Sequence, residues 1–139
     1  MNYLDFNPSS RPTAMGSKGM ATSAHPLASL AGINVLNKGG NAFDAIVAIA
    51  STLNVAEPFM SGMGGVGFGL VYQAKKKKLK FLDFSGFAPE LADPEKFTEE
   101  SKEIGPWAPV VPCNLAGWLT IQEELGVLER EQVFEDAIN

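Results

Sequence analysis

Six residues near the middle of the chain, Gly62–Gly67, read GMGGVG and have the glycine spacing of a phosphate-binding turn. In a dinucleotide-binding fold this turn joins a strand to a helix, whose free N–H groups hold the pyrophosphate. Asp83 follows at about the 20-residue distance at which an acidic side chain would bind the ribose. Nucleotide binding is therefore the first hypothesis that the residues raise.

The segments around these glycines favour a different role. The run before them has a helical pattern and the run after them is rich in β-forming residues, which reverses the order that the fingerprint needs. A dinucleotide-binding module would require a helix directly after Gly67, and the sequence indicates a hairpin there. We interpret the glycines as positions where a buried helix turns into a strand and neighbouring chain packs close.

One histidine and one cysteine, His25 and Cys113, are the residues that could form a nucleophile–base pair. His25 stands at an expected helix start without a nucleophile motif, so a structural role there is favoured. Cys113 is then expected to be a small buried or loop cysteine. A single cysteine also excludes an internal disulfide framework and argues against a thiolate zinc site, so no metal ligand is assigned.

Four other features have both a functional and a structural interpretation. Lys75–Lys78 could bind phosphate, but a solvated hairpin tip that discourages edge pairing is favoured. Glu57 lies beside the glycines and is expected to accept backbone N–H groups there. Trp107 and Trp118 are expected to anchor the core or a loop rather than to form a ligand cage.

The composition limits the classes of function. The chain has 139 residues, 45% of them hydrophobic and 19% charged, which suits one domain with a packed core. A net charge of −5 argues against nucleic acid as the main partner. No apolar run approaches the roughly 18 residues of a membrane span. Residues 1–20 read as an extended arm without the apolar core of a secretory signal, so the cytoplasm is the default expectation.

The apolar periodicity predicts two adjacent helices in the first half of the chain. The first spans residues 25–38, with Ser23 as its N-cap and Gly39 in a left-handed conformation after its end. Its apolar face is expected to comprise Leu27, Leu30, Ala31, Ile33, Val35 and Leu36. The second helix spans residues 42–56, is capped by Asn41 with Asp44 in its first turn, and is apolar enough to be buried.

A β-hairpin over about residues 67–84 follows, and further helices are predicted near 94–101, 115–125 and 129–138, so the fold class is α+β. The last pattern stops without a capping signal, which leads us to expect that residues 21–139 are an incomplete domain. Six glycines are predicted to be structural, with a tight helix-to-strand approach at Gly64. They are Gly39, Gly40, Gly62, Gly64, Gly65 and Gly67.

Three motifs in order resemble the N-terminal part of the gamma-glutamyltransferase family, which includes acylase-like and amidohydrolase-like relatives. They are ATSAHPLAS at 21–29, GGNAFDAIVA at 39–48 and EPFMSGMGGVGF at 57–68. Looser matches continue at 82–89, LDFSGFAP, and at 110–118, VVPCNLAGW. The resemblance covers nearly all of the chain but only the beginning of the family's longer polypeptide.

The resemblance implies the large-subunit start of an N-terminal-nucleophile hydrolase, whose fold is an αββα sandwich. Such an enzyme cleaves or transfers an amide-linked acyl group, gamma-glutamyl or related, through the N-terminal threonine of its small subunit and without a cofactor. None of this chain's threonines has that sequence context, so no catalytic residue is expected here. The implied partners are the remaining large- and small-subunit segments and a small-molecule amide substrate.

One position departs from the pattern of the transferases. In their DFRExAP segment an arginine binds the substrate α-carboxylate, whereas this chain has DFSGFAP, with Ser85 at that place. Ser85 and Gly86 are therefore the expected substrate-proximal residues, and the segment looks closer to the acylase and amidohydrolase branch. The alternative that stays open is a truncated, non-catalytic remnant, or a structural or binding domain of the same fold.

Overall fold

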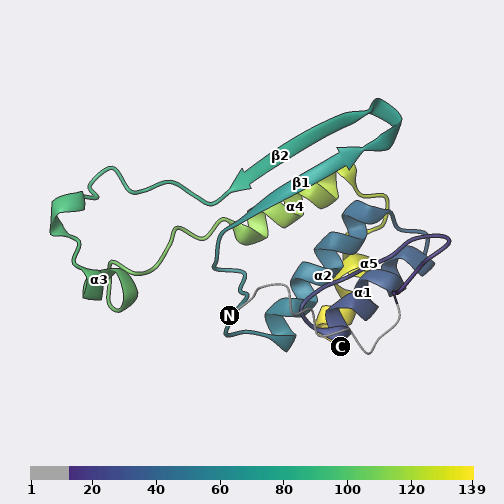
Figure 1. Cartoon of the computed structure of the whole chain (residues 1–139), viewed down its shortest axis with the longest axis horizontal. Helices are drawn as coiled ribbons and strands as arrows, with labels where there is room; N and C mark the ends of the chain where they lie inside the picture. The colour runs from purple at the N-terminus through teal and green to yellow at the C-terminus, as the bar shows by residue number, and fades with distance from the viewer. Residues whose placement is uncertain (1–12) are drawn as a thin grey trace, which may run out of the picture.

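The computed structural model describes residues 13–139, so residues 1–12 of the expected N-terminal arm lie outside the described part. Five α-helices and one two-stranded antiparallel sheet follow, and the α+β prediction is confirmed (Figure 1). The elements are α1 Pro26–Asn37, α2 Ala42–Ala56, β1 Gly67–Gln73, η1 Ala74–Lys76, β2 Lys78–Phe84, η2 Pro94–Lys96, α3 Glu99–Glu103, α4 Asn114–Leu125 and α5 Arg130–Ile138.

The N-cap of α1 is His25, so the assignment of Ser23 is wrong. Nδ1 of His25 accepts the N–H of Leu27 at 3.2 Å, and Pro26 occupies the first turn as expected. The Ser23 hydroxyl instead donates to the carbonyl oxygen of His25 at 2.8 Å and lies 2.8 Å from the hydroxyl of Ser29. Ser23 therefore stabilises the start of α1 through His25 and Ser29, and its side chain does not cap the first N–H groups.

The buried face of α1 agrees with the expected one at Ala31 and Val35 but not at the leucines, because it consists of small residues. Ala28, Ala31, Gly32 and Val35 are buried, whereas Leu27 and Leu30 are 58% and 52% exposed. A Cβ on Gly32 would lie 2.7 Å from the end of the Ile49 side chain in α2. The two helices thus approach too closely for leucines to lie between them.

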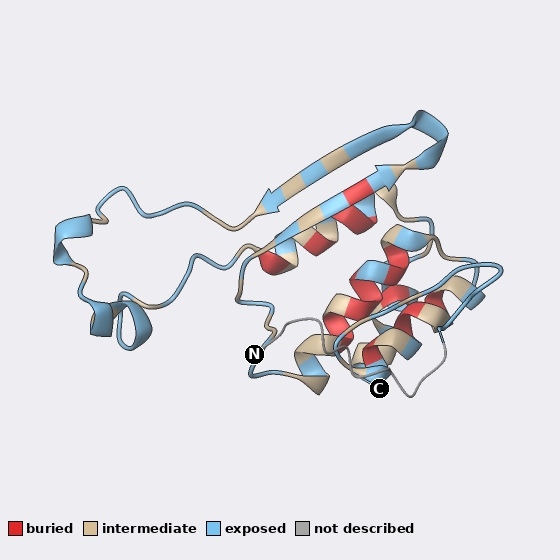
Figure 2. Ribbon diagram, in the orientation of Figure 1, coloured by how far each residue is buried: buried red, intermediate tan, exposed pale blue. Residues whose placement is uncertain are grey.

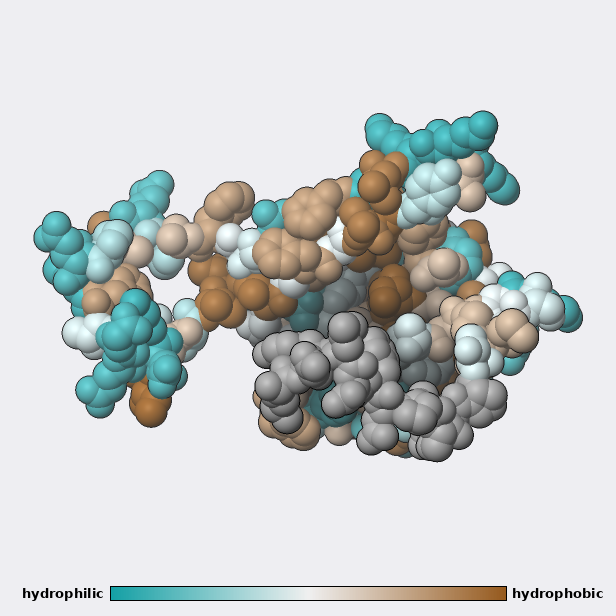
Figure 3. Space-filling model, in the orientation of Figure 1, coloured by the Kyte–Doolittle hydropathy of each residue, from teal (hydrophilic) through white to brown (hydrophobic). Residues whose placement is uncertain are grey.

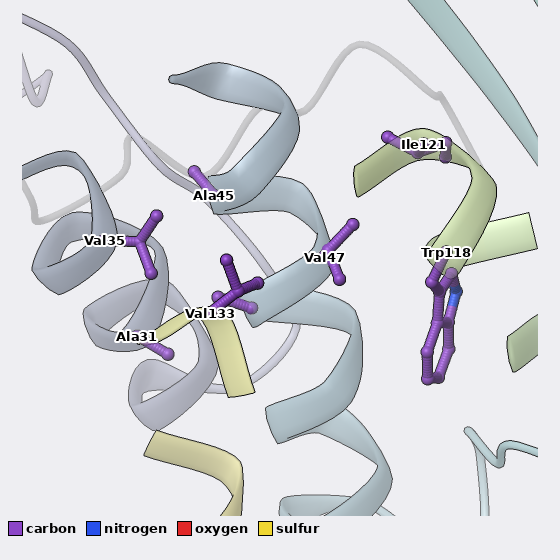
Figure 4. Close-up of a cluster of buried hydrophobic side chains, with 8 residues drawn as sticks. Ala31, Val35, Ala45, Val47, Trp118, Ile121 and Val133 are labelled. Atoms are coloured by element: carbon purple, nitrogen blue, oxygen red, sulfur yellow. The ribbon is translucent and has the colours of Figure 1, made fainter. Parts of the chain in front are cut away.

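Helix α2 runs through the centre of the helical layer, as its apolar composition predicted (Figure 2). Asn41 caps it through the N–H groups of Phe43 and Asp44, and the Asp44 carboxylate accepts the N–H of Asn41 in return. Val47 and Ala48 are fully buried. Figure 4 shows Val133 of α5 between Val35 of α1 and Val47, with Trp118 and Ile121 of α4 on the other side of α2.

The hairpin lies on α4 through one of its faces. Gly69 pairs with Leu82 and Val71 with Lys80, which fixes the register and turns Val71, Leu82 and Phe84 toward the helices. The turn is made by η1 and by Lys77, whose φ is 48°. The predicted bounds of 67–84 are confirmed, and the four lysines at the tip are exposed as expected.

Residues 85–113 form an arm that extends from the main body (Figure 1). The single helix expected near 94–101 is wrong, since two short pieces stand in its place. Asp93 caps η2, and Thr98 caps α3 through a reciprocal pair of bonds with Ser101. A cap every few residues favours separate turns over one continuous helix. Across residues 13–139, no helix has the length and apolar character needed to cross a bilayer.

Candidate substrate-facing site

The glycine segment docks on the start of α4 through backbone groups. The carbonyl oxygen of Gly65 accepts the N–H groups of Cys113 and Asn114 at 3.1 and 3.0 Å. The buried Asn114 side chain donates to the carbonyl oxygen of Gly62 at 2.8 Å. Asn114 was not singled out from the sequence, although it stands in the quoted VVPCNLAGW segment. Its role becomes apparent only in the folded chain, where its buried side chain donates to a carbonyl oxygen 52 residues earlier.

Gly40 and Gly67, two of the six glycines predicted to be structural, lie too close to their neighbours for a side chain. A Cβ at Gly67 would lie 2.6 Å from the Phe84 ring, and one at Gly40 would lie 2.8 Å from the carbonyl oxygen of Val35. Nothing lies within 4 Å of the corresponding position at Gly64, so the tight approach predicted there is wrong. The closest approach to Phe84 is at Gly117, where the distance would be 2.4 Å.

The order of elements around the glycines excludes the dinucleotide-binding arrangement. Helix α2 precedes Gly62 and strand β1 begins at Gly67, with only the hairpin between Gly67 and Asp83. No helix N-terminus therefore follows the glycine turn to hold a pyrophosphate. Asp83 instead stands at the end of β2, where it bonds to Ser85.

Asp83 and Ser85 form a local pair as the chain leaves the sheet. One carboxylate oxygen of Asp83 accepts the backbone N–H of Ser85 at 2.9 Å and its hydroxyl at 2.6 Å. These two hydrogen bonds, the hydroxyl one first, lower the pKa of Asp83 from its usual value. The pair therefore presents an ionised carboxylate and a hydroxyl whose oxygen lone pairs can accept a further hydrogen bond.

At Gly86 the chain that leaves β2 packs against the extended segment that precedes α4. The φ of Gly86, 78°, lies in the left-handed region, and a Cβ there would lie 3.1 Å from the carbonyl oxygen of Val111 and 3.5 Å from the sulfur of Cys113. A hollow of about 270 Å³ lies on one side, lined by Phe84, Phe87, Cys113 and Gly117 among others. A second one, of about 230 Å³, touches Ser85 and Val110.

The described residues offer hydrogen-bond acceptors and apolar walls at this place rather than a nucleophile. His25 is engaged as the cap of α1, and Cys113 lies at the N-cap position of α4. The Thr120 hydroxyl donates to the carbonyl oxygen of Ala116 at 2.9 Å. Over residues 13–139, no group of three His, Cys, Asp or Glu side chains is placed to hold a metal ion.

The remaining candidates have structural surroundings. The backbone carbonyl of Glu57 accepts the N–H groups of Met60 and Ser61, so the bonds expected there involve the main chain. Trp118 is buried in the core. Trp107 lies in the arm, with its ring 5.3 Å from that of Phe97 in an edge-to-face arrangement. These positions match the anchoring roles predicted for the two tryptophans.

Comparison with known proteins gives consistent results. The gamma-glutamyltranspeptidase family profile matches residues 28–139. The chain is 41% identical to a glutathione hydrolase proenzyme of Bacillus subtilis over 89% of its own length and 22% of that protein. It is 37% identical to an acylase ACY 1 proenzyme of a Pseudomonas species, over 96% of this chain and 26% of that protein. It therefore spans about a quarter of the length of these relatives.

A solved structure agrees with the sequence matches. The crystal structure of Helicobacter pylori gamma-glutamyltranspeptidase superposes with a TM-score of 0.84 and 35% identity, over 91% of this chain and 38% of that chain. The helices, the hairpin and their arrangement are thus those of an N-terminal-nucleophile hydrolase fragment. The chain belongs to the gamma-glutamyltranspeptidase family.

Proposed function

We propose that this chain is the N-terminal, large-subunit part of an enzyme that hydrolyses or transfers an amide-linked acyl group. The nucleophile is an N-terminal threonine in a segment outside these residues, and its own amine serves as the base. The partners are the remaining large-subunit and small-subunit segments and a small amide substrate. The family match over residues 28–139 carries the proposal.

In this enzyme the Asp83–Ser85 pair faces the acyl group of the substrate. A bidentate arginine contact is among the strongest ways to bind a carboxylate. Here the corresponding residue is Ser85, and its hydroxyl donates to an ionised neighbour. An anionic α-carboxylate would meet the negative charge of Asp83, whereas an amide or ammonium N–H group would find acceptors. The favoured substrate is therefore an acyl amide without a free α-carboxylate, as in the acylase and amidohydrolase branch.

The absence of a nucleophile from the chain can be tested on the chain alone. The purified 139-residue protein is incubated with a gamma-glutamyl anilide and with an acyl anilide that lacks the α-carboxylate. We expect no turnover of either substrate, because no threonine of the chain stands in an autocleavage context. Turnover that a substitution inside the chain abolishes would overturn this assignment of the nucleophile.

A further inference from the structure

Asn114 joins the glycine segment to the first turn of α4. It is 8% exposed, and its side-chain Nδ2 donates to the carbonyl oxygen of Gly62 at 2.8 Å. Its backbone N–H and that of Cys113 both donate to the carbonyl oxygen of Gly65. Helix α4 has no side-chain cap, so the Gly65 carbonyl takes the place of one. Of these three hydrogen bonds, only the one from the Asn114 side chain can be removed by a substitution.

Helix α2 holds the glycine segment from another side. Nδ2 of Asn54, near the end of α2, donates to the hydroxyl oxygen of Ser61 at 3.3 Å. Asn54 and Asn114 thus hold two successive residues, Ser61 and Gly62, from two different helices. The four glycines of the segment leave its backbone with little restraint of its own. Two side-chain amides therefore supply the restraint.

The chain that leads into Asn114 also supports the Ser85–Gly86 turn. Both hydrogen bonds that Ser85 donates in the described part of the chain go to Asp83, two residues earlier, and neither reaches a helix. Gly86 instead packs on the segment before α4, where an added Cβ would lie 3.1 Å from the Val111 carbonyl oxygen. The position of this turn relative to the glycine segment therefore depends on where Asn114 holds the start of α4.

The arm of residues 85–113 begins and ends at this place. Figure 3 shows apolar side chains where the arm joins the main body and mostly hydrophilic ones at its far end. The contact between Gly86 and the segment 111–113 brings the two ends of the arm together. This contact couples the substrate-facing turn to the first turn of α4.

We infer that Asn114 is a positioning residue of the proposed enzyme. Its side chain holds the glycine segment and, through residues 111–113, the Ser85–Gly86 turn in the arrangement that receives the acyl group. Asn114 acts without touching the substrate, since its amide nitrogen is bonded to Gly62. The inference rests on the proposed function, which gives the turn its substrate. A misplacement of about 1 Å in a group that orients a substrate can lower the rate by about 100-fold.

NMR of the 139-residue chain tests the structural half of the inference. Gln122→Ala is the matched control for Asn114→Ala, because Gln122 lies on the same helix, is also 8% exposed, and donates to the carbonyl oxygen of Leu128 at 2.8 Å. Asn114→Ala should shift the backbone amide signals of Ser85 and Gly86, and Gln122→Ala should leave both in place. Circular dichroism checks the fold. If Asn114→Ala does not fold, Asn114→Leu, which keeps the shape of the side chain, takes its place.

A chimera tests the catalytic half. Residues 28–139 replace the matching segment of the Bacillus subtilis glutathione hydrolase proenzyme. Asn114→Ala should lower kcat/KM for an acyl anilide by about 10- to 100-fold, because the turn is no longer held in place. Ser85→Arg should favour an anilide that carries an α-carboxylate. Asn114→Ala should remove most of that gain, whereas Gln122→Ala should retain it.

The results separate the role of Asn114 from the proposed function. Unmoved signals of Ser85 and Gly86 in the folded Asn114 variant would overturn the inference. Equal effects of Asn114→Ala and Gln122→Ala would also overturn it, since they would reflect a general loss of stability. A Ser85→Arg gain that survives Asn114→Ala would overturn it as well. A chimera without turnover would contradict the proposed function, and the NMR signals would then decide whether Asn114 positions the turn.

Discussion

The carboxylate of Asp44, at the start of α2, accepts the backbone N–H of Val127, which is 83 residues further along the chain, at 3.0 Å. The same fully buried carboxylate accepts the N–H of Asn41, and the Asn41 side chain donates to the carbonyl oxygen of Leu125 at 2.7 Å. The GGNAFDA segment thus holds the turn between α4 and α5 against α2. Its polar residues act as structural acceptors and donors in the core of the helical layer.

Replacing Asp44 with alanine should destabilise the fold strongly. The N–H groups of Asn41 and Val127 would lose the fully buried carboxylate that accepts them, which should lower the free energy of unfolding by about 2–4 kcal/mol. Urea denaturation followed by Trp118 fluorescence measures the change. Glu99→Ala, which removes an exposed ion pair with Lys102, is the control and should change it by less than about 0.5 kcal/mol. Equal effects of the two substitutions would show that the Asp44 contacts contribute little.

A methyl group at Gly117 should disturb the packing of the hairpin on α4. The new Cβ would lie 2.4 Å from the Phe84 ring, so the free energy of unfolding should fall by about 1–3 kcal/mol. Gly64→Ala is the matched substitution, because nothing lies within 4 Å of the added methyl, and its effect should be small. Thermal melting of both variants and of the parent protein measures the loss of stability. A larger loss at Gly64 than at Gly117 would contradict the packing described here.

Gly39 should be required for its backbone conformation and not for space. Its φ is 92° and nothing lies within 4 Å of an added Cβ, so Gly39→Ala should cost roughly 1 kcal/mol through strain alone. Gly39→Asn should cost less, since asparagine tolerates left-handed backbone better than alanine. Chemical denaturation of the two variants measures the difference. Identical stability of the alanine variant and the parent would rule out a left-handed residue at this position.

The hydrogen bonds from Ser85 should make Asp83 titrate at lower pH than an ordinary aspartate. Its folded-state pKa is depressed, so the stabilisation is present above the unfolded-state pKa and is lost as the pH falls through the folded-state pKa. Carbon-13 NMR of the carboxylate should show the pKa rising in Ser85→Ala and staying low in Ser85→Thr, which keeps the hydroxyl. An unchanged pKa in the alanine variant would mean that the Ser85 hydroxyl is not its cause.

Periodicity and capping residues predicted much of this fold from the sequence. The bounds of α2 and of the hairpin, the cap at Asn41 and the left-handed Gly39 all follow from local rules that neighbouring residues satisfy. The features that were missed depend on contacts between distant segments. The buried face of α1 is set by how closely α2 approaches Gly32, and the requirement for glycine at 117 is set by where Phe84 lies.

The candidate site was likewise predicted only in part from the sequence. The motif around Ser85 could be located from the sequence, because the transferases have an arginine at this position. Its bond to Asp83 depends on how the chain leaves β2, and the support from Asn114 to the glycine segment depends on the fold. A pattern of residue types along the chain does not specify which buried donor meets which carbonyl oxygen.

Transplanting the chain into a relative tests its proposed role in the enzyme most directly. Residues 28–139 replace the matching segment of the Bacillus subtilis glutathione hydrolase proenzyme, and denaturing electrophoresis follows the appearance of two subunits. The chimera is then assayed with paired anilides that differ only in the α-carboxylate. We predict two subunits and turnover without a preference for the carboxylate-bearing anilide. Ser85→Arg should then raise kcat/KM for that anilide by about one to two decades. A folded chimera that remains a single inactive chain, while the parent is processed under the same conditions, would contradict the central claim.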